Sequence, residues 1–335
     1  MLSKEQVKKI CAGIKNVRIG IIGDFCVDIY WHADMTKSEL SRETPHYPLP
    51  IVGERVYLGA GGNVASNLSE LSPKELIPIS LIGGDWRGML MEDIFEKSGM
   101  NRDFVIKVPG RFTNAYCKPM RKGISELEYE DPRLDFDNYE PISKETEDKV
   151  IENLRKISGN IDVLCVADQF RFGIITKLVR DEIIALAKSG LPVIADSRYN
   201  IGEYTDCILK PNEVECWRAV YNNEGYINAG YDEFIEAAKL LAKKNRSTVF
   251  CTLGKRGSIV TDGDRTEKAD AVLFDGEVDI CGAGDTSLSA FSAAIAAKTE
   301  LKAAAQFAGL ASGVTVRKIG VTGTASPEEI EALAQ

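Results

Sequence analysis

Apolar runs and amphipathic patterns alternate along most of the chain. Continuous apolar or β-branched runs, which predict buried parallel strands, lie at residues 17–23, 77–82, 161–167, 192–195, 207–209 and 248–253. Amphipathic or small-residue segments, which predict helices, lie at residues 1–15, 63–71, 86–98, 174–189, 231–244, 286–297 and 301–316. A strand is also predicted at 271–280 and a hairpin partner at 258–261. Right-handed crossovers would align the strand ends, so the pattern predicts an α/β fold with an open, largely parallel sheet.

Two segments break this alternation. Residues 29–57 and 111–131 are mixed polar and aromatic, with turn signals, and predict extended strands that leave the main sheet. Paired with each other, they would form a small β-sheet lid that excludes water from a pocket. Its exposed face would be a natural dimer surface. Because there is no internal repeat or low-complexity linker, we expect a single domain over residues 1–335.

Composition excludes several classes of function. The net charge of −9 argues against a nucleic-acid surface, and no apolar run reaches membrane-spanning length. The eight cysteines form no C-x-x-C pair, which is typical of reduced thiols in a cytoplasmic protein. With only His32 and His46, a multi-histidine zinc site is excluded and a histidine-based triad is disfavoured. Carboxylates, backbone amides and a hard cation must therefore carry the chemistry.

The most informative stretch is Gly282-Ala283-Gly284-Asp285, between a predicted strand and a long small-residue helix. A glycine turn at a helix start directs free N–H groups outward, and the helix dipole adds positive charge there. This favours a phosphate or similar anion. Asp285 in the same turn would suit a base that takes a proton from an attacking hydroxyl, or it would simply cap the helix.

Acidic and glycine-rich positions follow the first strand. Asp24 and Asp28 lie at its carboxyl end, where open α/β sheets bind ligands, and Asp28 would accept hydrogen bonds from a polyol or serve as a turn or cap residue. The glycine cluster at 59–63 leads into a helix and predicts a second anion or hydroxyl site. It is not a dinucleotide fingerprint, because Val64 stands where the third glycine should be.

Asn212 and Glu215 lie three residues apart at a predicted helix start. An amide and a carboxylate on one face would organise water around Mg²⁺, although the same pair would also form a capping box. The turn at 254–257 follows a strand, but the chain contains no G-x-x-x-x-G-K-[ST] P-loop.

Taken together and in this order, these motifs resemble the signature of the ribokinase-like (PfkB) carbohydrate kinases, over residues 17–334. Within that family the likeness is greatest to the kinase domain of the D-glycero-D-manno-heptose 7-phosphate kinases. The resemblance implies a doubly wound αβα sandwich with a β-sheet lid. It also implies ATP as co-substrate, Mg²⁺, and a homodimer formed through the lid. The implied reaction is phosphorylation of a sugar or sugar phosphate hydroxyl.

The resemblance also assigns a role to each motif. Asp285 would be the catalytic base, with the N–H groups of Gly282, Ala283 and Gly284 as the anion hole. The sugar would be held by Asp24, Asp28, Gly59, Ala60, Gly61 and Asn63. The nucleotide would be bound by Asn212, Thr252, Gly254, Gly257 and Ser312. Glu215 would position Mg²⁺ through water, and Asp279 would belong to a monovalent-cation loop for K⁺.

The chain departs from the family pattern at Ala60 and Cys281, where glycine and threonine are usual. Glu39 falls where the heptose kinases tend to have an arginine, and its carboxylate would repel a substrate phosphate. That phosphate would then be bound by Arg42, Lys118, Arg121 or Arg171. Three functions therefore stay open: a sugar kinase of heptose, fructokinase or ribokinase type, a catalytically weak sugar-binding protein on this fold, and a dinucleotide-dependent oxidoreductase, which the failed fingerprint disfavours.

Overall fold

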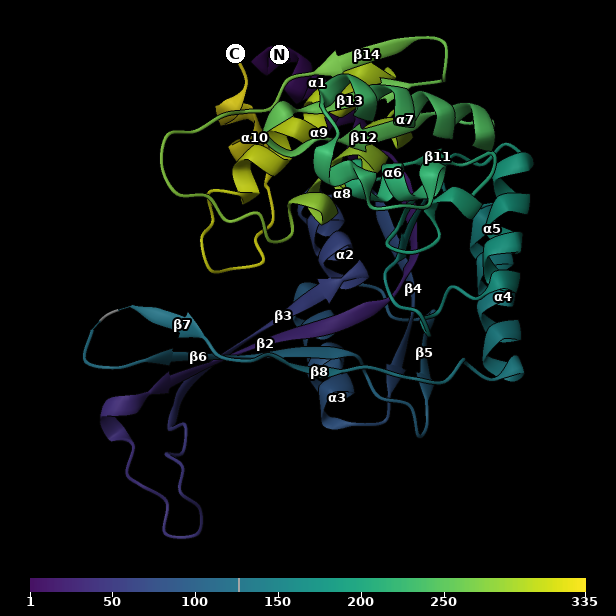
Figure 1. The fold of residues 1–335 in the computed structure, drawn as a ribbon. Coiled ribbons are helices and arrows are strands. Elements are labelled where there is room, and N and C mark those ends of the chain that lie inside the picture. Colours follow the sequence, from purple (N-terminus) through teal and green to yellow (C-terminus); the bar gives the residue numbers. More distant parts are fainter. Residues whose placement is uncertain (126) are drawn as a thin grey trace.

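The computed structural model describes residues 1–125 and 127–335, which form two sheets (Figure 1). In spatial order, the main sheet consists of β14 (Thr266–Ala269), β13 (Ser258–Thr261), β12 (Val249–Thr252), β11 (Ile208–Leu209), β10 (Val193–Ser197), β9 (Val163–Asp168), β1 (Arg18–Gly23), β4 (Glu75–Gly83) and β5 (Val105–Val108). Each neighbouring pair from β5 through β4, β1, β9, β10 and β11 to β12 is parallel. Strand β13 pairs antiparallel with β12 and with β14. In the central register, Gly20 of β1 lies opposite Ile77 and Leu164.

Helices cover both faces of the main sheet because its strands are apolar on both faces. In β1, Ile19 and Ile21 enter one core, whereas Ile22 enters the other. The first core is covered by α1 (Lys4–Ile14), α2 (Gly61–Glu70), α8 (Ala283–Ala296), α9 (Leu301–Thr315) and α10 (Pro327–Leu333). The second is covered by α4 (Lys144–Ser158), α5 (Lys177–Lys188), α6 (Glu213–Tyr221) and α7 (Tyr231–Asn245). The chain is thus the predicted doubly wound αβα sandwich.

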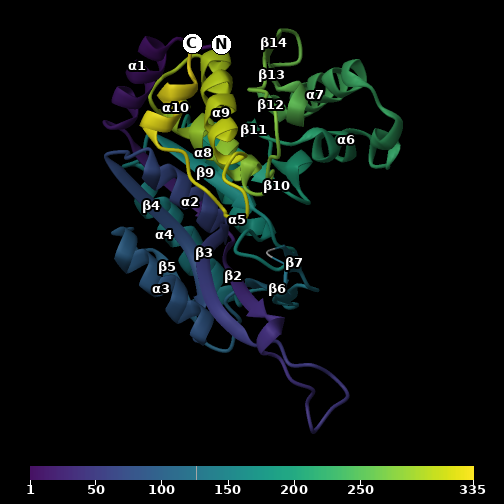
Figure 2. The ribbon, with the colours of Figure 1, turned by 90° about the vertical axis from the view of Figure 1, so that its left-hand side faces the viewer.

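A second sheet extends from the first. It contains β3 (Ile51–Ala60), β2 (Phe25–Asp34), β6 (Ala115–Lys122), β7 (Glu128–Glu130) and β8 (Leu134–Phe136). Figures 1 and 2 both show the loop at residues 35–50 at its far end. One face packs Val27 and Ile29 into the core beside α3 (Trp86–Ser98), which contributes Met91 and Phe95. The segments predicted to leave the main sheet therefore do so.

The opposite face of the second sheet is polar. Asp28 of β2 lies opposite Tyr57 of β3 and Tyr116 of β6, and Tyr30 lies opposite Lys118. Because side chains alternate along a strand, these residues share the face that Val27 and Ile29 do not use. This polar face is where a hydrophilic ligand would meet the second sheet.

Most predicted elements are present, and three differences have physical causes. The predicted strand at 271–280 is wrong, because β14 occupies the sheet edge and this segment runs on irregularly, with Leu273 and Ile280 exposed. Helix α4 was missed because only Thr146, Val150, Leu154 and Ile157 are buried in a charged sequence. Strand β5 is a four-residue edge strand and was also missed. Among the described residues, no helix is long and apolar enough to span a membrane.

Candidate active site

Asp285 lies in the first turn of α8, at the end of a glycine turn. Gly282 precedes the helix with φ 76°, and a Cβ there would lie 2.9 Å from Asn63 Nδ2, so glycine is favoured by both conformation and space. The Asp285 carboxylate accepts a hydrogen bond from Asn63 Nδ2 at 2.7 Å through Oδ2. The helix has no side-chain cap. The capping alternative for Asp285 therefore does not apply.

Asn63 is fixed by a chain of hydrogen bonds that joins α2 to α8. Asn67 donates through Nδ2 to Asn63 Oδ1 at 3.1 Å, and Thr286 donates through Oγ1 to Asn67 Oδ1 at 3.1 Å. Asn63 and Asn67 are one helical turn apart and both are buried. This pair orients the Asn63 amide so that it donates to Asp285. Asn67 was not among the predicted site residues, although two buried asparagines at this spacing are a sequence signal for it.

Asp28 faces the same region from the second sheet. Its side chain is 6% exposed, and Thr322 donates to Oδ2 at 3.4 Å. Oδ1 is buried and has no hydrogen-bond partner among the described residues. Burial raises the pKa of Asp28, and the nearby Lys118 ammonium opposes that rise. A buried acceptor without a donor is costly, so this oxygen is suited to a ligand hydroxyl. Asp28 lies within β2 and is neither a turn nor a cap residue.

The predicted glycine turn at residues 59–61 contacts both Asp28 and Asp24. A Cβ on Gly59 would fall 2.9 Å from Asp28 Cγ, so glycine leaves room for that carboxylate. The Gly61 N–H donates to the Asp24 carbonyl at 2.8 Å. Ala60 has φ 50° and ψ −128°, a conformation that costs free energy for any residue with a Cβ. The departure from glycine at this position is therefore a strained one.

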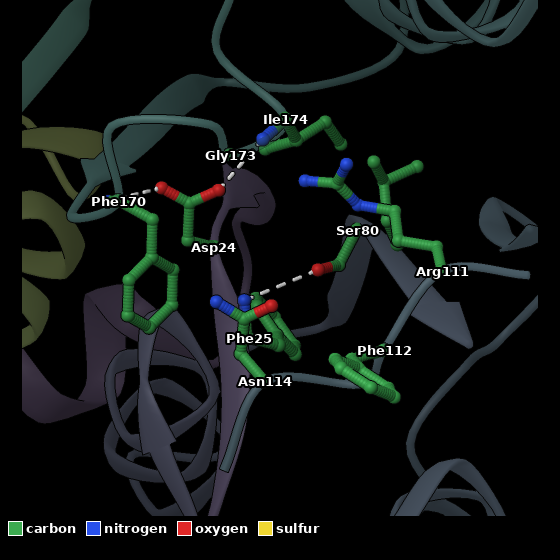
Figure 3. Close-up of a pocket in the computed structure, with 10 residues that line it drawn as sticks. Asp24, Phe25, Ser80, Arg111, Phe112, Asn114, Phe170, Gly173 and Ile174 are labelled. Carbon is green, nitrogen blue, oxygen red and sulfur yellow. Dashed lines mark hydrogen bonds between the residues drawn. The ribbon is translucent and has the colours of Figure 1, made fainter. Parts of the chain in front are cut away.

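Asp24 has a different set of partners from Asp28. Its carboxylate accepts hydrogen bonds from the backbone N–H groups of Phe170 and Ile174 at 2.8 and 2.7 Å (Figure 3). It also accepts one from the Gln169 N–H at 2.9 Å. Beside it is a cavity of about 20 Å³, which is room for about one water molecule. Burial, together with the nearby Asp168, raises the pKa of Asp24 to about 7. Asp24 therefore supports the loop after β9, a role that differs from the predicted sugar contact.

Asn212 and Glu215 form the capping box that was the alternative interpretation of their spacing. Asn212 Oδ1 accepts from the Glu215 N–H at 2.8 Å, and Glu215 Oε2 accepts from the Asn212 N–H at 2.9 Å. The start of α6 lies beside the end of β12, where the Thr252 N–H donates to the Pro211 carbonyl at 3.0 Å. Capping uses one Glu215 oxygen and leaves Oε1 for another ligand.

Lys210 is a central cation of the site that sequence reasoning missed. Its side chain is buried, and its ammonium forms an ion pair with Asp196 at the end of β10. The Lys210 Nζ atom lies 3.7 Å from where a Cβ of Gly284 would be, directly beside the predicted anion hole. Burial and Asp196 raise the pKa of Glu215 to about 7, and Lys210 opposes that rise. A lysine that ends a buried strand was the available signal.

These charges also act on Asp285. Burial raises the pKa of Asp285 to about 7; the Asn63 hydrogen bond and Lys210 lower it, whereas Asp196 and Asp28 raise it. Of the three predicted anion-hole donors, the Ala283 N–H donates to the Ile280 carbonyl at 3.2 Å. The N–H groups of Gly282 and Gly284 have no such partner among the described residues. The site thus places a carboxyl group with a pKa of about 7 near a lysine ammonium and two backbone amides that have no partner among the described residues.

Of the remaining predicted residues, Ser312 and Asp279 lie beside the start of α8, and Gly254 and Gly257 lie in a turn of the main sheet. Gly254 and Gly257 have φ 56° and 83° and form the turn from β12 to β13, where a Cβ on Gly257 would meet the Ala269 carbonyl at 2.2 Å. Ser312 Oγ donates to the Ala283 carbonyl at 3.2 Å and fixes α9 against the start of α8. Asp279 accepts from the Cys281 and Gly320 N–H groups at 2.9 and 3.0 Å.

A divalent cation bound here would be coordinated partly by protein carboxylates and partly by phosphate oxygens of a substrate. The part of the chain that the structure describes contains no group of three or more His, Cys, Asp or Glu side chains placed to bind a metal ion. Asp196 is close enough to Glu215 for its charge to contribute to the raised pKa of Glu215, after burial. Two carboxylates beside a phosphate site fit Mg²⁺, which keeps several of its waters and takes phosphate oxygens as ligands.

Known proteins share this sequence pattern and fold. The profile described as pfkB family carbohydrate kinase matches residues 51–329. The chain is 28% identical to the bifunctional protein HldE of Geotalea uraniireducens, covering 98% of this chain and 65% of the relative. It is 30% identical to the HldE of Sulfurimonas denitrificans, covering 94% and 63%. The chain therefore spans just under two thirds of these curated relatives.

Solved structures agree on the fold. Phosphofructokinase-2 from Escherichia coli, in complex with fructose-6-phosphate, has a TM-score of 0.74 at 18% identity and covers 95% of this chain and 98% of that one. Ribokinase from Arabidopsis thaliana, complexed with ribose and ATP, has a TM-score of 0.70 at 19% identity and covers 96% and 99%. The fold and the family match agree: this chain belongs to the pfkB family of carbohydrate kinases.

Proposed function

We propose that the enzyme transfers the γ-phosphoryl group of ATP to a hydroxyl of a sugar or sugar phosphate. Our best candidate is the 1-hydroxyl of D-glycero-D-manno-heptose 7-phosphate, supported by the motif likeness to heptose kinases. One observation carries the proposal. The site contains both Asp285, which Asn63 holds by a hydrogen bond, and Asp28, whose buried Oδ1 has no hydrogen-bond partner among the described residues. The runner-up is another sugar kinase of the family, such as a fructokinase or ribokinase.

The residues present divide the work of this reaction. Asn63 occupies Asp285 Oδ2, so Oδ1 is the oxygen that would take the proton of the attacking hydroxyl. Asp28 Oδ1 would accept a hydrogen bond from another hydroxyl and orient the sugar. The start of α8 and Lys210 would stabilise negative charge on the transferring group.

The metal and the lid complete the proposal. Glu215 and Asp196 would hold Mg²⁺ through water, and the ion, when bound, would neutralise charge on the nucleotide phosphates. The second sheet would act as the lid over the sugar and exclude water. Asp279 would support a K⁺ loop, which a comparison of activity in K⁺ and in Na⁺ salts tests. Exposed Ile51 and Val52 of β3, and exposed Tyr47 in the loop before it, support a homodimer, which sedimentation velocity tests.

The proposal is tested by Mg²⁺-dependent ADP release from ATP with a panel of acceptors. The panel contains the heptose 7-phosphate, fructose, fructose phosphates, ribose and nucleosides. Turnover of at least one sugar above the sugar-free rate is the expected result. If no acceptor is phosphorylated while a sugar still raises thermal stability, the chain is a sugar-binding protein on a kinase fold and the proposed reaction is wrong.

We expect kcat/KM to rise with pH through about 7. Burial raises the pKa of Asp285 to about 7, and only the ionised carboxylate accepts a proton, so activity is lost as pH falls below that value. The measurement is kcat/KM at roughly pH 5.5 to 8.5, with thermal unfolding at each pH as the control for folding. A flat profile over this range would contradict the assignment of Asp285 as the base.

A further inference from the structure

Two arginines at the carboxyl ends of main-sheet strands lie against the same tyrosine ring. Arg171 follows β9 and Arg198 follows β10, and neither guanidinium forms an ion pair or hydrogen bond with any described residue. Both lie against one ring, with their Cζ atoms 5.0 and 5.9 Å from the centroid of Tyr199. The carboxyl ends of two neighbouring parallel strands thus bring two guanidinium groups to one tyrosine ring, at the edge where an open α/β sheet binds its ligand.

The loop that carries Arg171 is held rigidly in place. Asp24 accepts three backbone hydrogen bonds from it, and Figure 3 shows those from Phe170 and Ile174. The guanidinium of Arg111 donates to the Phe172 carbonyl. The Phe170 ring also packs against Tyr116 of the second sheet, with centroids 6.1 Å apart. The position of Arg171 is therefore fixed by contacts on both sides of it, and this explains what the buried Asp24 carboxylate does.

Arg198 lies between the second sheet and the start of α6. Burial raises the pKa of Tyr116 and of Asp137 on the side of the second sheet, and of Glu215 on the other side, and the nearby Arg198 charge opposes each rise. Tyr116 lies opposite Asp28 in the β2–β6 register, so the two side chains share the polar face. A sugar that contacts Asp28 would therefore extend along this face toward Arg198.

The other basic side chains considered for a substrate anion are less suited to it. Lys118 is buried, donates to the Tyr30 hydroxyl at 2.9 Å, and is already balanced by Asp28. Arg121 forms an ion pair with Asp131 at 2.5 Å. Arg42 lies in the loop at the far end of the second sheet. Arg171 and Arg198 combine guanidinium groups that form no ion pair or hydrogen bond with a described residue with a place at the carboxyl ends of main-sheet strands.

We propose that Arg198 and Arg171 bind an anionic group carried by the sugar at a position remote from the hydroxyl that is phosphorylated. The acceptor class is then sugar phosphates or sugar acids, and neutral sugars are poor substrates. This inference rests on the proposed kinase function. A planar guanidinium binds either phosphate or carboxylate through paired N–H donors, so the chemistry is shared and the test must separate the two.

The test compares matched acceptors with arginine variants of the full chain. Acceptors are fructose and fructose 6-phosphate, the heptose and its 7-phosphate, and glucose and gluconate as the carboxylate pair. Variants are Arg198→Ala, Arg171→Ala and Arg198→Lys, with Arg102→Ala as a matched control at an exposed arginine between α3 and β5. Steady-state kinetics give KM and kcat for sugar and for ATP, and calorimetry gives sugar affinity without turnover.

We expect wild type to prefer the charged member of a pair, and Arg198→Ala to raise KM for it by about 10- to 100-fold. KM for ATP and for the neutral sugar should not change, and Arg198→Lys should recover part of the loss. Preference for a sugar phosphate or for gluconate identifies the anion.

Three results would overturn the inference. If wild type phosphorylates and binds the charged and neutral sugars of each pair equally well, the kinase proposal stands but the proposed anion site is wrong. A rise in KM for ATP alone would assign Arg198 to the nucleotide. If Arg102→Ala raises KM for the charged sugar as much as Arg198→Ala does, the rise reflects the net charge of the protein and not a contact made by Arg198. The two proposals can fail independently. Absence of turnover would contradict the kinase proposal, and calorimetry would still test the anion site by comparing the affinities for charged and neutral sugars.

Discussion

Asp285→Asn is expected to lower kcat by about 10²- to 10⁴-fold, the usual contribution of a general base. The amide keeps the size of the side chain and can still accept the hydrogen bond from Asn63 through its oxygen. It cannot take a proton from the attacking hydroxyl. The change is measured as ADP release at saturating ATP and sugar, with the acceptor that wild type uses best.

The same variant should be at least as stable as wild type above neutral pH. The folded protein raises the pKa of Asp285 to about 7, so it binds this proton more tightly than the unfolded chain does. Ionisation therefore costs stability as pH rises from the unfolded pKa through about 7, and asparagine removes that cost. Denaturant unfolding at pH 8 measures it. A kcat within about tenfold of wild type, in a folded variant that binds sugar and ATP, would refute the assigned mechanism.

The fold was largely predictable because its strands are apolar on both faces and its helices are amphipathic. Such patterns specify the layers directly, as Ile19, Ile21 and Ile22 of β1 illustrate. The predicted strand at 271–280 failed for a tertiary reason. A further strand can pair only with a free edge of the main sheet, and the β13–β14 hairpin forms the edge next to this segment. Local pattern carries no information about that competition.

The proximity of some candidate site residues could be predicted from the alternation of strands and helices along the chain. Asp28, Asn63 and Asp285 come from three distant segments, and the ends of parallel strands and the starts of helices meet at one edge. The sequence does not distinguish Asp24 from Asp28, because both are carboxylates that follow the first strand. The backbone donors that occupy Asp24 lie about 145 residues away, and only folding shows them.

Lys210→Met is expected to affect stability and activity together. Methionine keeps the length of the lysine stem but leaves Asp196 without its buried partner and removes the cation that lowers the pKa of Glu215. Removing one member of a buried ion pair usually costs about 3–5 kcal/mol in the free energy of unfolding. Activity at pH 7 should also fall, because Lys210 lies beside Gly284 and lowers the pKa of Asp285.

The double variant Lys210→Met/Asp196→Asn separates these two effects. It removes both charges of the ion pair, so most of the lost stability should return in denaturant unfolding, because Asp196→Asn removes the buried charge that Lys210→Met leaves without its direct partner. Activity should stay low if the Lys210 ammonium stabilises the transferring phosphoryl group. Asp196→Asn alone is the matched control for any loss through the metal site. If the double variant is more active than that control, Lys210 serves only to balance Asp196 and has no part in phosphoryl transfer.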